Sequence, residues 1–363
     1  MSSISLCMIV KNESQVIERC LKCVSDLVDE IVIVDTGSTD DTMSIARKFT
    51  DSIYEFPWID DFSAARNFSF SKATKEYIMW LDADDIILNE DRIKLRQLKA
   101  ILTPTEHDMV MMKYNVAFDE NEKPTFSYYR ERIVKNKAGY LWTGPIHEVI
   151  CPLGNIIYSD VAITHKKMHT NEPFRNLNIF RKMLSKGINL DARQQFYYAR
   201  ELYYNGLYEE AIKEFSSFLC REDGWIENRI NACQDLAYCY YRIKEDNLAL
   251  RALLKSLELD QPRAEICCDI GRHFFDRKNY KVAIFWYELA ATRKLDQSSG
   301  GFKMMDCYGY IPYLQLCVCY DRIGDREKAI KYNEMAAAIK PNDAKVLYNR
   351  AYFKVSESKE MSR

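Results

Sequence analysis

A short apolar run that ends in three aspartates constrains this chain most: Tyr77 to Leu81 is followed by Asp82, Asp84 and Asp85. The run is too short for a buried helix and suits a strand that is covered on both faces, as in a parallel sheet. Because like charges repel and Asp disfavours strands, folding alone gives no reason for the cluster. Oxygen ligands suit Mg²⁺ or Mn²⁺, and open α/β sheets bind ligands beyond the carboxyl ends of their strands. We therefore expect a divalent cation here.

Apolar runs and helical patterns alternate along the first part of the chain. We expect strands at Ile4 to Val10 and Glu30 to Asp35, a helix between them, and further alternation up to the aspartate cluster. This order is typical of βαβ units and predicts an α/β domain with a Rossmann-like, mostly parallel sheet. The carboxyl ends of the strands then bring Lys11-Asn12-Glu13 and Asp35 close to the cluster.

The motifs that bind nucleotide phosphates through glycine loops are absent from the sequence, since it contains neither GxGxxG nor GxxxxGK[ST]. A nucleotide bound at this edge must therefore present its phosphates to the metal. A metal that neutralises a departing diphosphate, beside an Asp that accepts hydrogen bonds from a base or ribose, suits transfer from a nucleoside-diphosphate-activated donor.

Four motifs now carry a resemblance: MIVKNE, IVDTGSTDDT, DFSAARNFSFSKA and YIMWLDADD. In order and spacing they resemble family 2 glycosyltransferases with a GT-A fold. The resemblance implies that Asp35 contacts the uracil of a UDP-sugar, that the DxD motif handles ribose and metal, and that Asp84 is the direct metal ligand. The expected nucleotide-sugar-binding residues are Val10, Asn12, Glu13, Asp35, Arg66, Asp82 and Ala83.

The segments WIDDFSAARN, GPIHEVI and ITHKKMHT resemble a subgroup that modifies peptides or proteins, including bacteriocin S-glycosyltransferases. The resemblance implies inversion at the sugar, with UDP-glucose or UDP-N-acetylglucosamine as the donor. The acceptor atom stays open between the side chains of Ser, Thr, Tyr and Cys. A Cys acceptor depends less on a base, because its thiol is already partly ionised.

An inverting transfer needs a group that removes the acceptor's proton, and a carboxylate is the usual choice. A Gly-Pro turn delivers His147 and Glu148 together after an aromatic pair. We expect Glu148 to be the base, with a strand-end salt bridge as an equal interpretation and Asp85 as the fallback base. His165, which follows an apolar run, is expected as a further metal ligand, and a structural hydrogen bond is its alternative.

Strands are also expected at Met109 to Val116 and Thr125 to Tyr129. Arg130, Arg132 and Lys135 follow the second of these. Their positive charge could meet phosphates, and solvation at the surface is an equally good interpretation.

A helical repeat replaces the strands from about residue 171. Small residues recur 34 positions apart at Ala249 and Ala283, and the pattern extends to Ala211 and Ala329. This period predicts tetratricopeptide (TPR) helix pairs that stack into an all-α solenoid. We expect a GT-A domain at 1–170, a linker helix at 171–190, and a solenoid of about four repeats with a capping helix at 191–363.

Composition limits the function classes. Lys and Arg total 51 against 53 Asp and Glu, which argues against nucleic-acid binding as the main function. The sequence shows no signal peptide and no apolar stretch of about 20 residues that would span a membrane. The twelve scattered cysteines fit a reducing, cytoplasmic location.

Together these patterns predict a metal-dependent, inverting glycosyltransferase that uses Mn²⁺ or Mg²⁺. Its solenoid is expected to recruit a peptide or protein acceptor or to form a homodimer. Two alternatives stay open: transfer to a cell-surface glycan or lipid-linked sugar, and a non-catalytic TPR scaffold with a degenerate transferase domain. The intact Asp82, Asp84 and Asp35 count against the scaffold.

Overall fold

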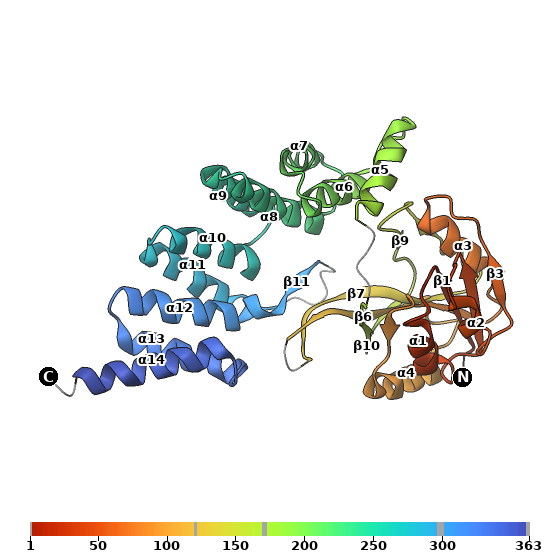
Figure 1. Cartoon of the computed structure of the whole chain (residues 1–363), viewed down its shortest axis with the longest axis horizontal. Helices are drawn as coiled ribbons and strands as arrows, with labels where there is room; N and C mark the ends of the chain where they lie inside the picture. The colour runs from red at the N-terminus through yellow and green to blue at the C-terminus, as the bar shows by residue number, and fades with distance from the viewer. Residues whose placement is uncertain (1, 120–121, 169–172, 296–300, 361–363) are drawn as a thin grey trace. The chain divides into compact units, whose positions relative to one another are not determined.

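The computed structural model describes residues 2–119, 122–168, 173–295 and 301–360. The chain divides into two compact units, Met1–Glu201 and Leu202–Arg363. This division falls later in the chain than the expected bounds at 170 and 190. Figure 1 shows strands and helices in the first unit and mostly helices in the second.

A mixed sheet forms the centre of the first unit. Its strands are β1 (Ile4–Val10), β2 (Glu30–Asp35), β3 (Ile53–Glu55), β4 (Tyr77–Trp80), β5 (Asp85–Ile86), β6 (Met109–Phe118), β7 (Pro124–Lys135) and β10 (Ile156–His165). They pair in the order β3-β2-β1-β4-β7-β6-β10-β5. Neighbours from β3 to β4 are parallel, as are β6 and β10, whereas β7 and β5 are antiparallel to their neighbours. The expected α/β domain with a mostly parallel sheet is confirmed.

Helices and a small ribbon cover both faces of this sheet. The covering helices are α1 (Ile17–Val24), α2 (Thr42–Ala46), α3 (Phe62–Lys72) and α4 (Asn89–Ile101), and the ribbon pairs β8 (Trp142–Thr143) with β9 (Val149–Ile150). Two further helices, α5 (Arg175–Ser185) and α6 (Ala192–Tyr204), follow the last strand of the sheet in the chain. Leu21 of α1 and Leu95 of α4 share a buried apolar cluster with one face of the sheet. Phe70 of α3 and Trp142 of β8 belong to the cluster on the other face.

The strand register places the polar segments at one edge. Val10 is the partner of Asp35 where β1 and β2 end, and Cys7 of β1 is the partner of Trp80 at the end of β4. Because these strands are parallel, the segments after all three emerge on the same side of the sheet. The aspartate cluster therefore begins beside the ends of β1 and β2.

Strand β7 differs from the sequence prediction because it continues to Lys135 rather than ending at Tyr129. Arg132 is fully buried inside it, so neither surface solvation nor phosphate contact describes this residue. Arg130 pairs with Glu131, and Lys135 lies 3.5 Å from Asp108. Strand β7 can bury positively charged side chains because buried carboxylates lie close enough to pair with them.

Paired helices build the second unit. They are α7 (Tyr208–Leu219), α8 (Ile226–Arg242), α9 (Asp246–Lys255), α10 (Ala264–Asp276), α11 (Tyr280–Thr292), α12 (Tyr310–Arg322), α13 (Arg326–Ile339) and α14 (Ala344–Glu360), with short elements η1 (Ser256–Glu258), β11 (Lys303–Met304) and η2 (Met305–Tyr308). Successive helices pack as α8 with α9, α10 with α11 and α12 with α13. Periodic small residues such as Ala249 and Ala283 are fully buried. The expected TPR-type solenoid is confirmed.

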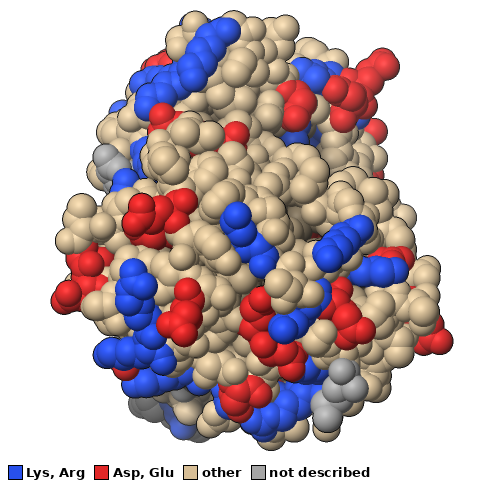
Figure 2. Space-filling model, turned by 90° about the vertical axis from the view of Figure 1, so that its right-hand side faces the viewer, with Lys and Arg blue, Asp and Glu red and all other residues tan. Residues whose placement is uncertain are grey.

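Two surface properties bear on function. Among the described residues, no helix has the length and hydrophobicity needed to cross a membrane. On the face of the molecule in Figure 2, Lys and Arg lie interspersed with Asp and Glu.

Candidate active site

The loop after β2 closes onto the end of β1. Asn12 has a backbone φ of +55°, a left-handed conformation that Asn tolerates, and its Oδ1 accepts a hydrogen bond from Thr39 N at 2.8 Å. The Asp35 carboxylate accepts from Ser38 N at 3.1 Å, and the Val10 carbonyl accepts from Thr36 N at 2.9 Å. These contacts hold three of the expected donor-binding residues at one edge.

Glu13 connects this loop electrostatically to the aspartate cluster. Its backbone N–H donates to Thr42 Oγ1 at 2.7 Å, which fixes it beside α2. Burial, together with the negative charges of Asp84, Asp82 and Asp40, raises the pKa of Glu13 to about 7. Acids from three separate segments therefore converge.

The segment from Asp82 to Asp85 forms a closed turn. Asp85 N donates to the Asp82 carbonyl at 3.0 Å, and Asp82 N donates to Asp85 Oδ2 at 3.1 Å. The Asp84 carbonyl accepts from Lys166 N at 3.0 Å. Ala83 inside the turn is buried. The turn thus fixes the backbone of the DxD motif before any ligand binds.

His165 lies against this turn although it is distant in sequence, because β10 pairs with β5 and places His165 opposite Asp85. Its Nδ1 is 3.3 Å from Asp84 Oδ1 and 3.4 Å from Asp85 Oδ1. The three side chains offer ligand atoms that all lie within 4.8 Å of one another. Burial lowers the pKa of His165, but the two carboxylates outweigh it and raise the value to about 9.

Asp85 is fully buried and both of its oxygens are engaged. Arg132 Nη1 donates to Oδ2 at 3.0 Å, and the Tyr114 hydroxyl donates to Oδ1 at 3.0 Å. The Arg132 guanidinium lies 3.8 Å from the centroid of the Trp80 ring and 4.3 Å from that of Tyr114. These cation–π contacts partly replace water for a guanidinium whose Nε and Nη2 have no hydrogen-bond partner in the described structure.

Arg66 joins the DxD motif to the segment that carries Glu148. Its Nε donates to Glu148 Oε1 at 2.7 Å and its Nη2 to Asp82 Oδ1 at 2.8 Å. The guanidinium is buried 5.0 Å from the Trp80 ring centroid and 4.8 Å from that of Trp142. Burial alone raises the pKa of Asp82, but nearby Arg66 and Arg132 outweigh it and lower the value to about 2.

The loop before Glu148 is fixed by an unusual backbone and by ring stacking. His147 has a φ of +53°, and its ring stacks on Tyr197 with centroids 4.2 Å apart. His147 Nε2 forms a hydrogen bond with Glu201 Oε1 at 2.8 Å. A left-handed backbone at a non-glycine residue costs free energy, and such residues cluster at functional sites. The side chain of Glu148 is thereby held beside Arg66.

The sequence-predicted residues thus form two groups at the same edge. Asp84, Asp85 and His165 make one group, and Arg66 links Asp82 to Glu148 in the other. Sequence reasoning missed Tyr114 and the partnership of Arg132 with Asp85. One signal was available for Arg132, since the apolar pair Ile133-Val134 directly follows it and indicates a buried strand.

Comparisons with known proteins identify the family of the first unit. The family model described as Glycosyl transferase family 2 matches residues 5–187. The SPbeta prophage-derived glycosyltransferase SunS of Bacillus subtilis is 27% identical over 275 residues, which cover 72% of this chain and 63% of that protein. The TPR repeat-containing protein Synpcc7942_0270 of Synechococcus elongatus is 36% identical over 151 residues, or 41% of this chain and 36% of that protein. The chain thus spans less than two thirds of the length of either curated relative.

Solved structures resemble this chain over a more limited extent. The crystal structure of MamA has a TM-score of 0.38 and 19% identity, and the match covers 47% of this chain and 90% of that one. The family model, by contrast, covers half of the 363 residues and includes the whole edge that carries Asp35, Asp84 and Glu148. The chain therefore belongs to glycosyl transferase family 2.

Proposed function

We propose that this glycosyltransferase is metal-dependent and inverting, and that it moves a hexose from a UDP-sugar to a side chain of a peptide or protein. The approach of His165 Nδ1 to within 3.3 Å of Asp84 Oδ1, at the strand ends that also carry Asp35 and Asp82, is the main support.

A divalent cation fits the residues present. Asp84 and His165 would hold it, because the neighbouring Asp85 is already bonded through both oxygens. One carboxylate and one imidazole suit Mn²⁺, and Mg²⁺ is the alternative because it prefers oxygen ligands. When bound, the ion neutralises charge on the diphosphate of the donor.

The residues proposed to bind the nucleotide-sugar donor are those that the family resemblance implies and that lie at this edge of the sheet. Asp35 would accept a hydrogen bond from uracil, and Val10 at the end of β1 would line the nucleotide together with Asn12 and Glu13, which follow it. Asp82 and Ala83 would meet the ribose. Arg66 orients Asp82 through the ion pair at 2.8 Å.

Glu148 is the proposed base. Arg66 occupies its Oε1, whereas its Oε2 has no hydrogen-bond partner among the described residues and is left for the acceptor. The proton moves from the acceptor hydroxyl or thiol to Glu148 as the acceptor atom bonds to the sugar C1. The bond from C1 to the diphosphate oxygen breaks, and its electron pair leaves with the diphosphate. We assign Asp85 to positioning, because a fully buried carboxylate offers no open face to an acceptor.

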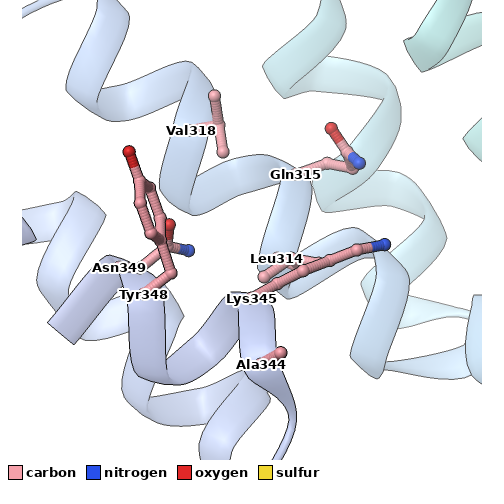
Figure 3. A pocket seen from close by; sticks show the side chains of 7 residues that line it. All are labelled: Leu314, Gln315, Val318, Ala344, Lys345, Tyr348 and Asn349. Atoms are coloured by element: carbon pink, nitrogen blue, oxygen red, sulfur yellow. The ribbon is translucent and has the colours of Figure 1, made fainter. Parts of the chain in front are cut away.

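The solenoid would recruit the acceptor. A groove of about 380 Å³ lies between α12 and α14, and its apolar wall includes Leu314, Val318 and Tyr348. Figure 3 shows these side chains together with Gln315, whose amide can bond a peptide backbone. Apolar grooves with a few polar groups are the usual form of peptide and ligand sites.

Calorimetry tests the donor class directly. The purified chain would be titrated with UDP, UDP-glucose, UDP-N-acetylglucosamine, GDP and ADP, each with and without Mn²⁺. We expect Mn²⁺-dependent binding of the uridine nucleotides only, and slow Mn²⁺-dependent hydrolysis of one UDP-sugar. Absence of nucleotide binding would contradict the proposal and favour the scaffold alternative. Transfer to a lipid-linked sugar but to no peptide would contradict the acceptor class alone.

A further inference from the structure

The departing diphosphate needs positive charge from the protein as well as a metal, and most cations at this edge are already bound to protein groups. Arg66 is shared between Asp82 and Glu148, and Arg132 pairs with Asp85. Arg19 donates to the Lys166 carbonyl at 2.8 Å, and Lys166 pairs with Glu122. These side chains hold the site together and have little capacity left for a ligand.

Arg175 is a cation of a different kind. It is the first residue of α5, in the segment predicted from the sequence to be a linker helix. Its guanidinium carbon lies 5.2 Å from the centroid of the Phe62 ring. Phe62 begins α3, and Arg66 lies one turn further on the same face of that helix. Arg175 thus lies on the side of α3 that leads to Asp82.

A second set of contacts fixes the start of α5 beside the proposed base. Asn176 Nδ2 donates to Glu201 Oε1 at 2.9 Å, and the same oxygen bonds His147 Nε2 at 2.8 Å. His147 directly precedes Glu148. The side chain of Arg175 therefore contacts α3, and the next residue, Asn176, is linked through Glu201 to the loop that holds Glu148.

The charge of Arg175 is not paired with a described carboxylate and acts on the acids of the site. The side chain is half-buried, no described carboxylate forms an ion pair with it, and its hydrogen bond goes to the neutral Asn176 Oδ1 at 3.3 Å. Its positive charge also acts on Glu13, where it opposes the effects of burial and of Asp84 on the pKa. A guanidinium binds phosphate oxygens in a bidentate manner, which suits a diphosphate.

We propose that Arg175 binds the diphosphate of the nucleotide-sugar donor and stabilises it as it leaves. This inference rests on the proposed function. In the step concerned, the bond between the sugar C1 and the diphosphate oxygen breaks and the electron pair stays on that oxygen. Arg175 keeps all its protons and balances the added negative charge.

The test compares the variants R175A and R175K with wild type in titrations with UDP and with uridine in the presence of Mn²⁺. Loss of a charged hydrogen-bond donor predicts UDP binding weaker by roughly 10- to 100-fold in R175A, with uridine binding unchanged. R175K should recover part of the affinity. K186A, a change of an exposed cation just after the same helix, is the matched control and should bind UDP as wild type does.

Each other outcome has a defined meaning. Equal affinity of wild type and R175A for UDP, at equal thermal stability, would overturn the assignment of Arg175 and leave the proposed function intact. The variants K11A and K167A each remove an exposed cation near the strand ends. If UDP affinity fell only in one of these variants and not in R175A, the assignment of Arg175 would also be overturned. Failure of wild type to bind any nucleotide would instead overturn the proposed function, on which this inference depends.

Discussion

The two units arrange their charged groups in different ways. In the transferase unit, groups from distant segments form connected chains, such as Glu148 to Arg66 to Asp82. In the solenoid, an exposed ion pair such as Arg350 with Glu334 joins the neighbouring helices α14 and α13, and buried small residues carry the repeat. A change in the first unit leaves a buried charge without its partner, whereas a change in the second affects one helix contact. The difference predicts unequal costs of substitution.

The largest expected effect is on ligand binding at the connected site. Asp84→Ala should abolish Mn²⁺-dependent UDP binding, because one of two proposed ligands is lost, while the far-ultraviolet helical signal stays that of wild type. Calorimetry with UDP and Mn²⁺ measures this. Asp160→Ala, at an exposed carboxylate in the same unit, is the control. Unchanged binding would remove Asp84 from the proposed metal site.

The next effect is on stability. Arg132→Met should lower the free energy of unfolding by about 3–5 kcal/mol, since it leaves the fully buried Asp85 without its cation. Urea unfolding of the first unit measures the change. Combining it with Asp85→Asn should restore part of the loss, because the unpaired charge is then gone. An effect below about 1 kcal/mol would mean that the pair does not act as a connected buried unit.

An effect on rate separates the base from the structural ion pair. Glu148→Gln should slow transfer by roughly 10²-fold or more and leave UDP binding nearly unchanged, as expected when a general base is lost. Steady-state kinetics with an accepted peptide measures the rate. Because Gln cannot pair ionically with Arg66, thermal unfolding is the accompanying control. A wild-type rate would contradict the assignment of Glu148.

A smaller effect concerns pH and the solenoid. Asp269 of α10 accepts hydrogen bonds from Tyr238 at 2.7 Å and from Gln234 at 2.5 Å, yet burial dominates and raises its pKa to about 6. The folded state then holds a proton that the unfolded state releases near pH 4. Stability from this group is present below about pH 4 and is lost as pH rises through about 6.

Between about pH 4.5 and 6.5 the free energy of unfolding of the solenoid should therefore fall by about 1–2 kcal/mol. Urea unfolding across this range measures the slope. Asp269→Asn imitates the protonated carboxyl, so the variant should lack the part of this pH dependence of the free energy of unfolding that comes from Asp269. An identical slope in the variant would show that Asp269 does not titrate in this range.

The smallest effect tests close packing inside one helix pair. A Cβ added at Gly271 would lie 2.9 Å from the ring of Tyr287, which is itself buried. Overpacking costs about 1–3 kcal/mol, and the better helix propensity of Ala returns roughly 1 kcal/mol, so Gly271→Ala should destabilise the solenoid by about 1 kcal/mol. The double variant Gly271→Ala/Tyr287→Leu should lose less free energy of unfolding than the sum of the losses of the two single variants. Strict additivity would argue against the clash.

Local pattern explains what could be predicted from the sequence. The strands, the helices and the buried alanines of the solenoid repeat with short periods, so residues near one another in sequence determine them. The cluster at Asp82 to Asp85 could be placed because parallel strands end at one edge. His165 could be suggested but not positioned, since its approach to Asp84 depends on the pairing of β10 with β5.

Long-range partners explain what could not be predicted. The contact of Arg132 with Asp85 joins residues 47 positions apart, and that of Arg66 with Glu148 joins residues 82 apart. Such pairs follow no period, so an Arg in a strand resembles a solvated charge until the opposing carboxylate is known. Arg175 shows the same limit, because its proximity to Phe62 of α3 depends on how α5 folds back.

The two-residue strand β5 also affects the behaviour of the protein in solution. It covers the outer edge of β10 at His165 and Thr164, and further along the Asp91 carboxylate accepts from Ala162 N at 3.0 Å. On its inner side, the pairing of β10 with β6 shifts register between Ser159 and Ala162, so β10 is not a regular strand along its length. Bulges, short strands and side-chain caps keep edge strands from pairing with other chains. The segment that brings His165 to Asp84 thus also protects the sheet from aggregation through this edge.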